Sequence, residues 1–111
     1  RSSDLEELTI SGLAGICFFS EYYFMRFFKK YMGMSCVQYI KNVRLERAAD
    51  QFENGETNTL EVALACGFSN LSYFHREFKK KYGMTPKRFI SLSARAADFH
   101  EIVNNYHFYD S

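Results

Sequence analysis

The chain has 111 residues, which suits one domain or two very small ones that share a core. Its hydrophobic fraction of 47% and aromatic fraction of 18% exclude a disordered chain, because this much apolar surface can offset chain entropy. One Pro and 6 Gly argue against a turn-rich sandwich and favour long helices, and no apolar run approaches the length that spans a bilayer. The opening at Arg1, without an initiator Met, predicts a piece cut from a longer protein.

An internal repeat organises the chain. Positions within 13–20 match positions within 62–69 at an offset of 49, and positions within 23–40 match positions within 73–90 at an offset of 50. Chance similarity would not keep an order this long, so each half is predicted to form one supersecondary unit.

The first half predicts a short helix, a tight turn and a longer helix. Ser20 is the expected N-cap of the longer helix, and Gly33 is its expected stop. The apolar stripe of that helix consists of Phe24, Phe28 and Tyr31.

A linker helix is predicted next. Ser35 and Gln38 form a capping box that opens a helix to about Phe52, and residues 53–56 end it. Its inner side is expected to carry Ile40, Val43, Ala48 and Phe52. The 17 residues from 36 to 52 span roughly 26 Å. With the bodies it joins, this linker could hold two helices about one DNA turn apart, roughly 34 Å.

The second half repeats the pattern. Asn58 and Glu61 form a capping box that opens a short helix to about Cys66. Gly67 is expected to make the turn, and Ser69 is the expected cap of the next helix.

That helix is expected over residues 70–82. Its stripe consists of Phe74, Phe78 and Tyr82, Gly83 stops it, and Thr85-Pro86 opens another helix. The sequence therefore predicts an all-α fold with two helix-turn-helix subdomains joined by a long linker helix, a homeodomain-like architecture.

Basic charge is concentrated in two places, although the net charge of the chain is only +1. Residues 69–88 hold six Lys or Arg against one acid, and residues 20–32 hold three against one. Two basic patches on a nearly neutral body are compatible with nucleic-acid binding.

The exposed faces of the two longer helices carry side chains suited to DNA. The first face presents Glu21, Tyr22, Met25, Arg26 and Lys29, and the second presents Leu71, Ser72, His75, Arg76 and Lys79. In a major groove, Arg reads guanine edges, small polar groups read adenine or phosphate, and apolar atoms meet thymine methyls. Ordinary solvated faces are the alternative, but two such faces in register with two turns favour DNA.

The cysteines and histidines do not indicate a metal site. Cys17, Cys36 and Cys66 are an odd count without CxxC spacing, and the three His are scattered. We expect reduced thiols packed among helices, and neither a metal nor another cofactor.

The motifs of the chain resemble one known family. The second half contains Ala63-Leu64-Ala65-Cys66-Gly67-Phe68-Ser69, then residues 73–80 reading YFHREFKK, then Gly83-Met84-Thr85-Pro86 and Phe89. The runs 28–35 and 44–48 are similar to that family as well. Over residues 8 to 92, the chain resembles the AraC/XylS transcription regulators.

This resemblance implies a bacterial, cytoplasmic protein that binds double-stranded promoter DNA, with RNA polymerase as a candidate partner, no membrane contact, and a sensor or receiver domain elsewhere. Implied base-contacting residues are Tyr22, Met25, Arg26, Leu71, Ser72, His75 and Arg76. Expected phosphate-contacting residues are Ser20, Lys29, Lys30, Ser69, Lys79 and Lys80. The fragment itself is expected to be monomeric.

The expected boundaries are a truncated helix remnant or linker (1–8), a first unit (9–34), a linker helix (35–53), a second unit (58–92) within a DNA-binding domain (9–92), and a tail (93–111).

Three departures from the family matter: Phe18 stands where the second unit has Gly67, Thr59 replaces an aliphatic, and little precedes Thr9. The tail keeps helical spacing and is expected to continue from the domain or pack back on it, with contact to another domain or a second copy as the alternative.

Two other classes of function compete with DNA binding. An enzyme is disfavoured, because no nucleophilic arrangement or phosphate-cradling glycine loop is present in the sequence. A helical protein-interaction module without DNA binding is the stronger rival. The paired basic faces at a fixed spacing favour DNA, since a protein partner would not need them in duplicate.

Overall fold

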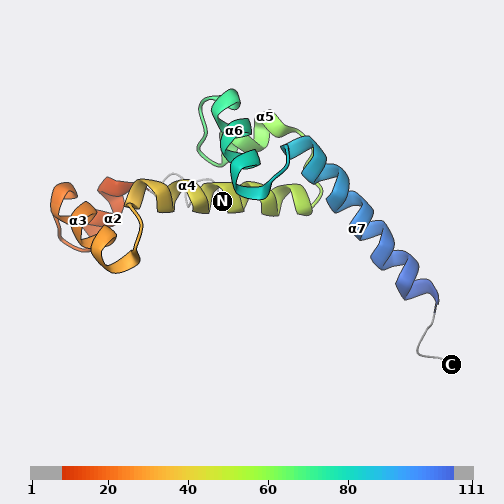
Figure 1. The fold of residues 1–111 in the computed structure, drawn as a ribbon, viewed down its shortest axis with the longest axis horizontal. Coiled ribbons are helices and arrows are strands. Elements are labelled where there is room, and N and C mark those ends of the chain that lie inside the picture. The colour runs from red at the N-terminus through yellow and green to blue at the C-terminus, as the bar shows by residue number, and fades with distance from the viewer. Residues whose placement is uncertain (1–8, 107–111) are drawn as a thin grey trace.

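The computed structural model describes residues 9–106, which form two helical units joined by one long helix (Figure 1). The helices are α2 (Ile10–Ile16), α3 (Glu21–Met32), α4 (Cys36–Glu53), α5 (Thr59–Ala65), α6 (Leu71–Tyr82) and α7 (Pro86–Tyr106). No strand occurs within 9–106, so the predicted all-α, double helix-turn-helix fold is confirmed. The expected remnant at 1–8 lies outside the described residues, as do 107–111.

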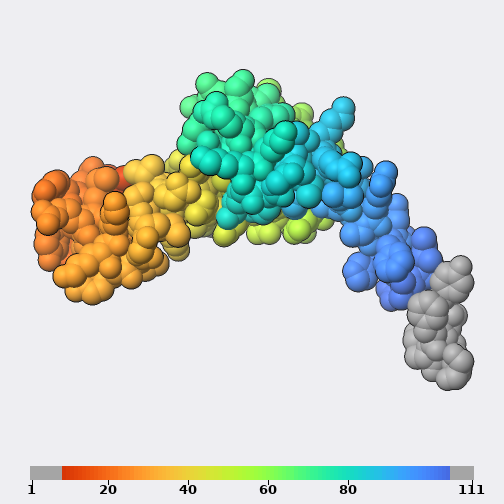
Figure 2. Space-filling view, viewed as in Figure 1, coloured from red at the N-terminus to blue at the C-terminus, as the bar shows by residue number. Residues whose placement is uncertain are grey.

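Two hydrophobic cores lie along the same linker helix. The smaller core joins Ala14 of α2, Phe24 of α3 and the first half of α4, where Cys36 and Ile40 are buried. The larger core gathers ten buried residues: Leu45, Ala48, Ala49, Phe52, Val62, Ala63, Cys66, Phe68, Phe74 and Phe78. Each unit therefore packs on its own stretch of α4, and the space-filling view shows two separate lobes (Figure 2).

Most of the predicted helix ends are confirmed. The hydroxyl of Ser20 accepts a hydrogen bond from Tyr23 N at 3.2 Å, and that of Ser35 accepts one from Gln38 N at 3.1 Å. Asn58 and Thr85 accept in the same way at the starts of α5 and α7. The glycine stops Gly33 and Gly83 have φ of 80° and 75°, a left-handed conformation that glycine adopts without strain.

The cap of α6 differs from the prediction. Asn70, not Ser69, is the N-cap, and its Oδ1 accepts a hydrogen bond from Tyr73 N at 2.9 Å. The helix therefore begins one residue later than a Ser69 cap would require. Asn is as good a cap as Ser, so the sequence offered two adjacent candidates.

Two side chains expected to be packed inside are exposed. Tyr31 is expected on the inner stripe of α3, but it is 66% exposed, and its ring lies 4.6 Å from that of Phe27 at a tilt of 44°. Cys17 lies exposed at the end of α2, whereas Cys36 and Cys66 are buried as expected. Both residues lie in the first unit but outside its core, which has four buried residues against ten in the larger core.

The turn of the first unit is built without glycine. Phe18 has φ of +60°, and it is the one non-glycine residue with positive φ in the described chain. A positive φ strains an L-residue, and because the side chain is 95% exposed, no packing offsets that strain. The equivalent Gly67 has φ of +97°.

The tail continues the last helix. α7 is unbroken over 21 residues and leads away from the second unit (Figure 1). Phe99 and Ile102 are exposed, so the expectation that the tail packs back on the domain is wrong for the described residues. Among the helices described here, none has both the length and the apolar character needed to cross a membrane.

Candidate nucleic-acid interface

All thirteen predicted site residues lie on α3 and α6 or within two residues before them. Their side chains are exposed, except that His75 is half-buried and its ring meets the edge of Phe74. The apolar stripes below them hold each helix in its core, because Phe24 is buried in the first unit and Phe74 and Phe78 in the second. The polar faces of both helices are therefore turned outward.

On α3, one arginine is held by its own helix. The Nη1 of Arg26 donates a hydrogen bond to the hydroxyl of Tyr22 at 3.2 Å, and its guanidinium carbon lies 5.7 Å from the centre of that ring. A shallow groove runs beside this pair, lined by Met25, Lys29, Lys30 and the start of α4. Arginine, an apolar side chain and two lysines thus share one surface.

On α6, the equivalent arginine has different neighbours. The guanidinium carbon of Arg76 lies 5.3 Å from the centre of the Tyr73 ring, and its Nε lies 3.7 Å from Oε2 of Glu77. Leu71 and Ser72 are exposed beside the helix start, and Lys79 and Lys80 are exposed one turn beyond Arg76. This order, with mixed side chains first and lysines later, matches that of α3.

The acid within the second basic patch is buried and paired. Glu77 Oε1 accepts a hydrogen bond from Lys41 Nζ of α4 at 2.7 Å, and its side chain is only 9% exposed. The hydrogen bond from Lys41, followed by the charges of Lys41, Lys80 and Arg76, holds the pKa of Glu77 below its usual value despite burial. The exposed part of this face is therefore basic.

The sequence does not reveal that Glu77 pairs with the linker helix. In the sequence it is only the one acid among six basic residues. Its partner Lys41 is 36 residues away. A charged residue at the flank of an apolar stripe was the available local signal.

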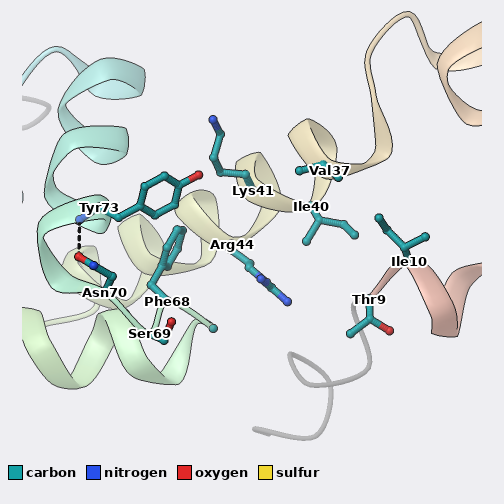
Figure 3. Close-up of a pocket in the computed structure, with 11 residues that line it drawn as sticks. Thr9, Ile10, Val37, Ile40, Lys41, Arg44, Phe68, Ser69, Asn70 and Tyr73 are labelled. Atoms are coloured by element: carbon teal, nitrogen blue, oxygen red, sulfur yellow. Dashed lines mark hydrogen bonds between the residues drawn. The ribbon is translucent and has the colours of Figure 1, made fainter. Parts of the chain in front are cut away.

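A pocket separates the two units on one side of α4 (Figure 3). It is lined by Thr9 and Ile10 of the first unit, by the turn and start of α6, and by α4 residues that include Lys41 and Arg44. A Cβ added at Gly67 would lie 2.9 Å from Arg44 Nε, so the second turn packs tightly against the linker. Glycine is needed there for space as well as for its positive φ.

The described residues 9–106 contain two buried cysteines, Cys36 and Cys66. No group of three or more His, Cys, Asp or Glu within that range could hold a metal ion. Burial raises the pKa of the Cys66 thiol to about 11 and also raises that of Cys36. These two thiols are poor nucleophiles at neutral pH.

Two capped helices of one repeat, each anchored by an aromatic stripe and each turning arginine and lysine outward, define a helix-turn-helix DNA-binding domain. The family model described as "Helix-turn-helix domain" matches residues 13–91.

Known proteins agree with this class. The chain is 40% identical over 88 residues to the bifunctional transcriptional activator/DNA repair enzyme AdaA of Bacillus subtilis, covering 79% of this chain and 42% of that protein. A probable AraC family transcriptional regulator from Rhodopseudomonas palustris superposes with a TM-score of 0.68 at 29% identity, covering 77% of this chain and 81% of that one. The C-terminal domain of the two-component response regulator yesN from Fusobacterium nucleatum gives 0.66 at 33%, covering 74% and 80%. The chain belongs to the AraC/XylS family of transcription regulators and forms its DNA-binding domain.

Proposed function

We propose that the domain binds one asymmetric promoter site as a monomer, with α3 and α6 in two successive major grooves on one face of the duplex. The linker α4 has 18 residues, so its axis is about 27 Å long. With the units at its two ends, this length suits grooves separated by one helical turn, roughly 34 Å.

The observation that carries the proposal is the matched pair of arginines. Arg26 and Arg76 occupy equivalent positions of the repeat, both are exposed, and both lie beside a tyrosine ring. An arginine of this kind can donate two hydrogen bonds to a guanine edge. The proposed base contacts are Tyr22, Met25, Arg26, Leu71, Ser72, His75 and Arg76.

The proposed phosphate contacts flank these residues. Ser20 and Ser69 precede the two helices, and Lys29, Lys30, Lys79 and Lys80 lie in their later turns. A lysine near a phosphate releases a counterion and adds affinity that does not depend on sequence.

Footprinting tests the site. The duplex would be one selected from random sequences by the purified domain. The domain should protect one face of this duplex over two adjacent major grooves, and the protected sequence should not be palindromic. A palindromic footprint that needs two copies would contradict binding as a monomer. A domain that binds no duplex even at low salt would favour the protein-interaction alternative.

The variants Arg76→Ala and Lys80→Ala distinguish base recognition from phosphate binding. Arg76→Ala should weaken binding to the selected duplex by about 1–3 kcal/mol and barely affect random DNA. Lys80→Ala should weaken both duplexes alike and reduce the salt slope by about 1. Binding measured on both duplexes over a salt series decides, and an equal loss on both for Arg76→Ala would remove its base-reading role.

For the longer protein, we propose a sensor or receiver domain that controls this DNA-binding domain in the bacterial cytoplasm, with RNA polymerase as a further partner. The chain spans less than half of AdaA, and one structural neighbour is the C-terminal domain of a response regulator. Phosphorylation or ligand binding that changes promoter affinity in the full-length protein would support this arrangement, and unchanged affinity would oppose it.

A further inference from the structure

The carboxylate of Glu77 faces two cations with different roles. Oε1 is bonded to Lys41 of the linker at 2.7 Å, and Oε2 lies 3.7 Å from Nε of Arg76. The side chain of Lys41 is 18% exposed and that of Arg76 is 66% exposed. A nearly buried acid, bonded to Lys41, thus lies beside the Nε of an otherwise exposed arginine.

This arrangement limits how Arg76 can move. The ring of Tyr73 lies beside its guanidinium carbon at 5.3 Å, and Glu77 attracts its Nε. The Nη groups remain for a partner outside the protein, and they are the donors used in a bidentate contact with guanine. An arginine already held in place loses less conformational freedom when it binds, so more of the contact energy appears as affinity.

The first unit has no such acid. Phe27 occupies the position equivalent to Glu77, and Arg26 rests instead on the hydroxyl of Tyr22. The first arginine is held within its own helix, whereas the second is connected through Glu77 to α4. The two units therefore restrain equivalent arginines by different means.

We infer that Glu77 is a positioning residue, anchored by Lys41, that orients Arg76 for base recognition and so sharpens the sequence selectivity of the second unit. This inference rests on the proposed base-reading role of Arg76. It has a distinctive consequence, because an acid near DNA repels phosphates. Removing the charge should raise affinity for random DNA while lowering the preference for the selected site.

The test is a double-mutant cycle on selectivity, defined as the ratio of affinities for the selected and random duplexes at one salt concentration. The isosteric Glu77→Gln should lower this ratio about threefold to tenfold without weakening random-duplex binding. In the Arg76→Ala background, Glu77→Gln should lower it no further. A purely structural role would lower it in both backgrounds.

Glu46→Gln is the matched control, because Glu46 forms the other ion pair between α4 and α6, with Lys81 at 3.6 Å, and does not touch Arg76. It should leave selectivity unchanged. Circular dichroism would verify that each variant is folded.

The outcomes separate the two claims. If Arg76→Ala does not reduce selectivity, the proposed base-reading role fails and the inference fails with it. If Arg76→Ala reduces selectivity but Glu77→Gln leaves it intact, or acts equally without Arg76, only the positioning role is overturned. An equal loss for Glu46→Gln would also overturn it, since any ion pair between α4 and α6 would then suffice.

Discussion

Replacing Phe18 with glycine should stabilise the domain. An L-residue with a side chain costs about 1–2 kcal/mol in the left-handed conformation, and Phe18 adopts it at φ +60°. The ring is 95% exposed, so its removal sacrifices almost no buried apolar surface. Glycine gains about 0.5–1 kcal/mol of extra freedom in the unfolded chain, which offsets part of the relief. The net expectation is about 0.5–1 kcal/mol of added stability, or roughly 2–8 °C in Tm.

The equivalent turn of the second unit supplies the reverse substitution. Gly67→Ala introduces a Cβ at φ +97°, 2.9 Å from Arg44 Nε. Backbone strain is the main cost, because the flexible end of Arg44 can shift, so we expect a loss of about 1–2 kcal/mol. Glycine is thus expected to be the more stable residue at both of these matched positions.

Urea and thermal unfolding followed by circular dichroism would measure both effects, with duplex binding as a check that the fold is retained. A lower Tm for Phe18→Gly would refute the reasoning, because it would mean that the exposed ring contributes more than its backbone strain removes. An unchanged Tm for Gly67→Ala would show that neither the positive φ nor the contact with Arg44 costs stability there.

A thiol reagent at neutral pH should modify Cys17 alone in the folded domain and leave DNA affinity intact, since Cys36 and Cys66 are buried with raised pKa values. Mass spectrometry of the modified domain would check this, and labelling of a buried thiol without unfolding would contradict it. Because the pKa of Glu77 is lowered in the folded state, its contribution is present above the unfolded pKa and lost as pH falls through the folded one. The Tm difference between the wild type and Glu77→Gln should therefore shrink as pH falls below about 4.3, the ordinary pKa of Glu, and a difference independent of pH would oppose the ion pair. A chain ending at Ser93 should keep the Tm and duplex binding of the full chain, because the rest of α7 leads away from both cores. A large loss of Tm or of duplex affinity would show that the tail belongs to the domain.

The sequence was sufficient for the fold because its local signals agreed with each other. Ser20 and Ser35 cap helices as expected, and Gly33 and Gly83 end them. Where two neighbours offered the same chemistry, local reasoning had no basis for choice, and α6 is capped by Asn70.

Long-range packing was beyond the same reasoning. Helical spacing puts Tyr31 near the apolar stripe of α3, yet no element described here covers it. The pairing of Glu77 with Lys41 depends on how α6 rests on α4, which no local pattern encodes. The candidate base contacts followed from the repeat and the family motifs, whereas the restraint on Arg76 required coordinates.

Because α4 is unbroken, the number of residues in it sets how far one unit is rotated about the helix axis relative to the other. Each residue of an α-helix turns the axis by about 100° and advances it by about 1.5 Å. One residue inserted in α4 between Ile40 and Leu45, which belong to different cores, would swing one recognition helix far around the axis while barely lengthening it. Seven inserted residues would nearly restore the phase and add about 10 Å, close to three base pairs of duplex. Because major grooves on one face of the duplex recur only once per helical turn, roughly 34 Å, even that insertion would move one recognition helix off its groove, so DNA reading constrains both the rotational phase and the length of α4.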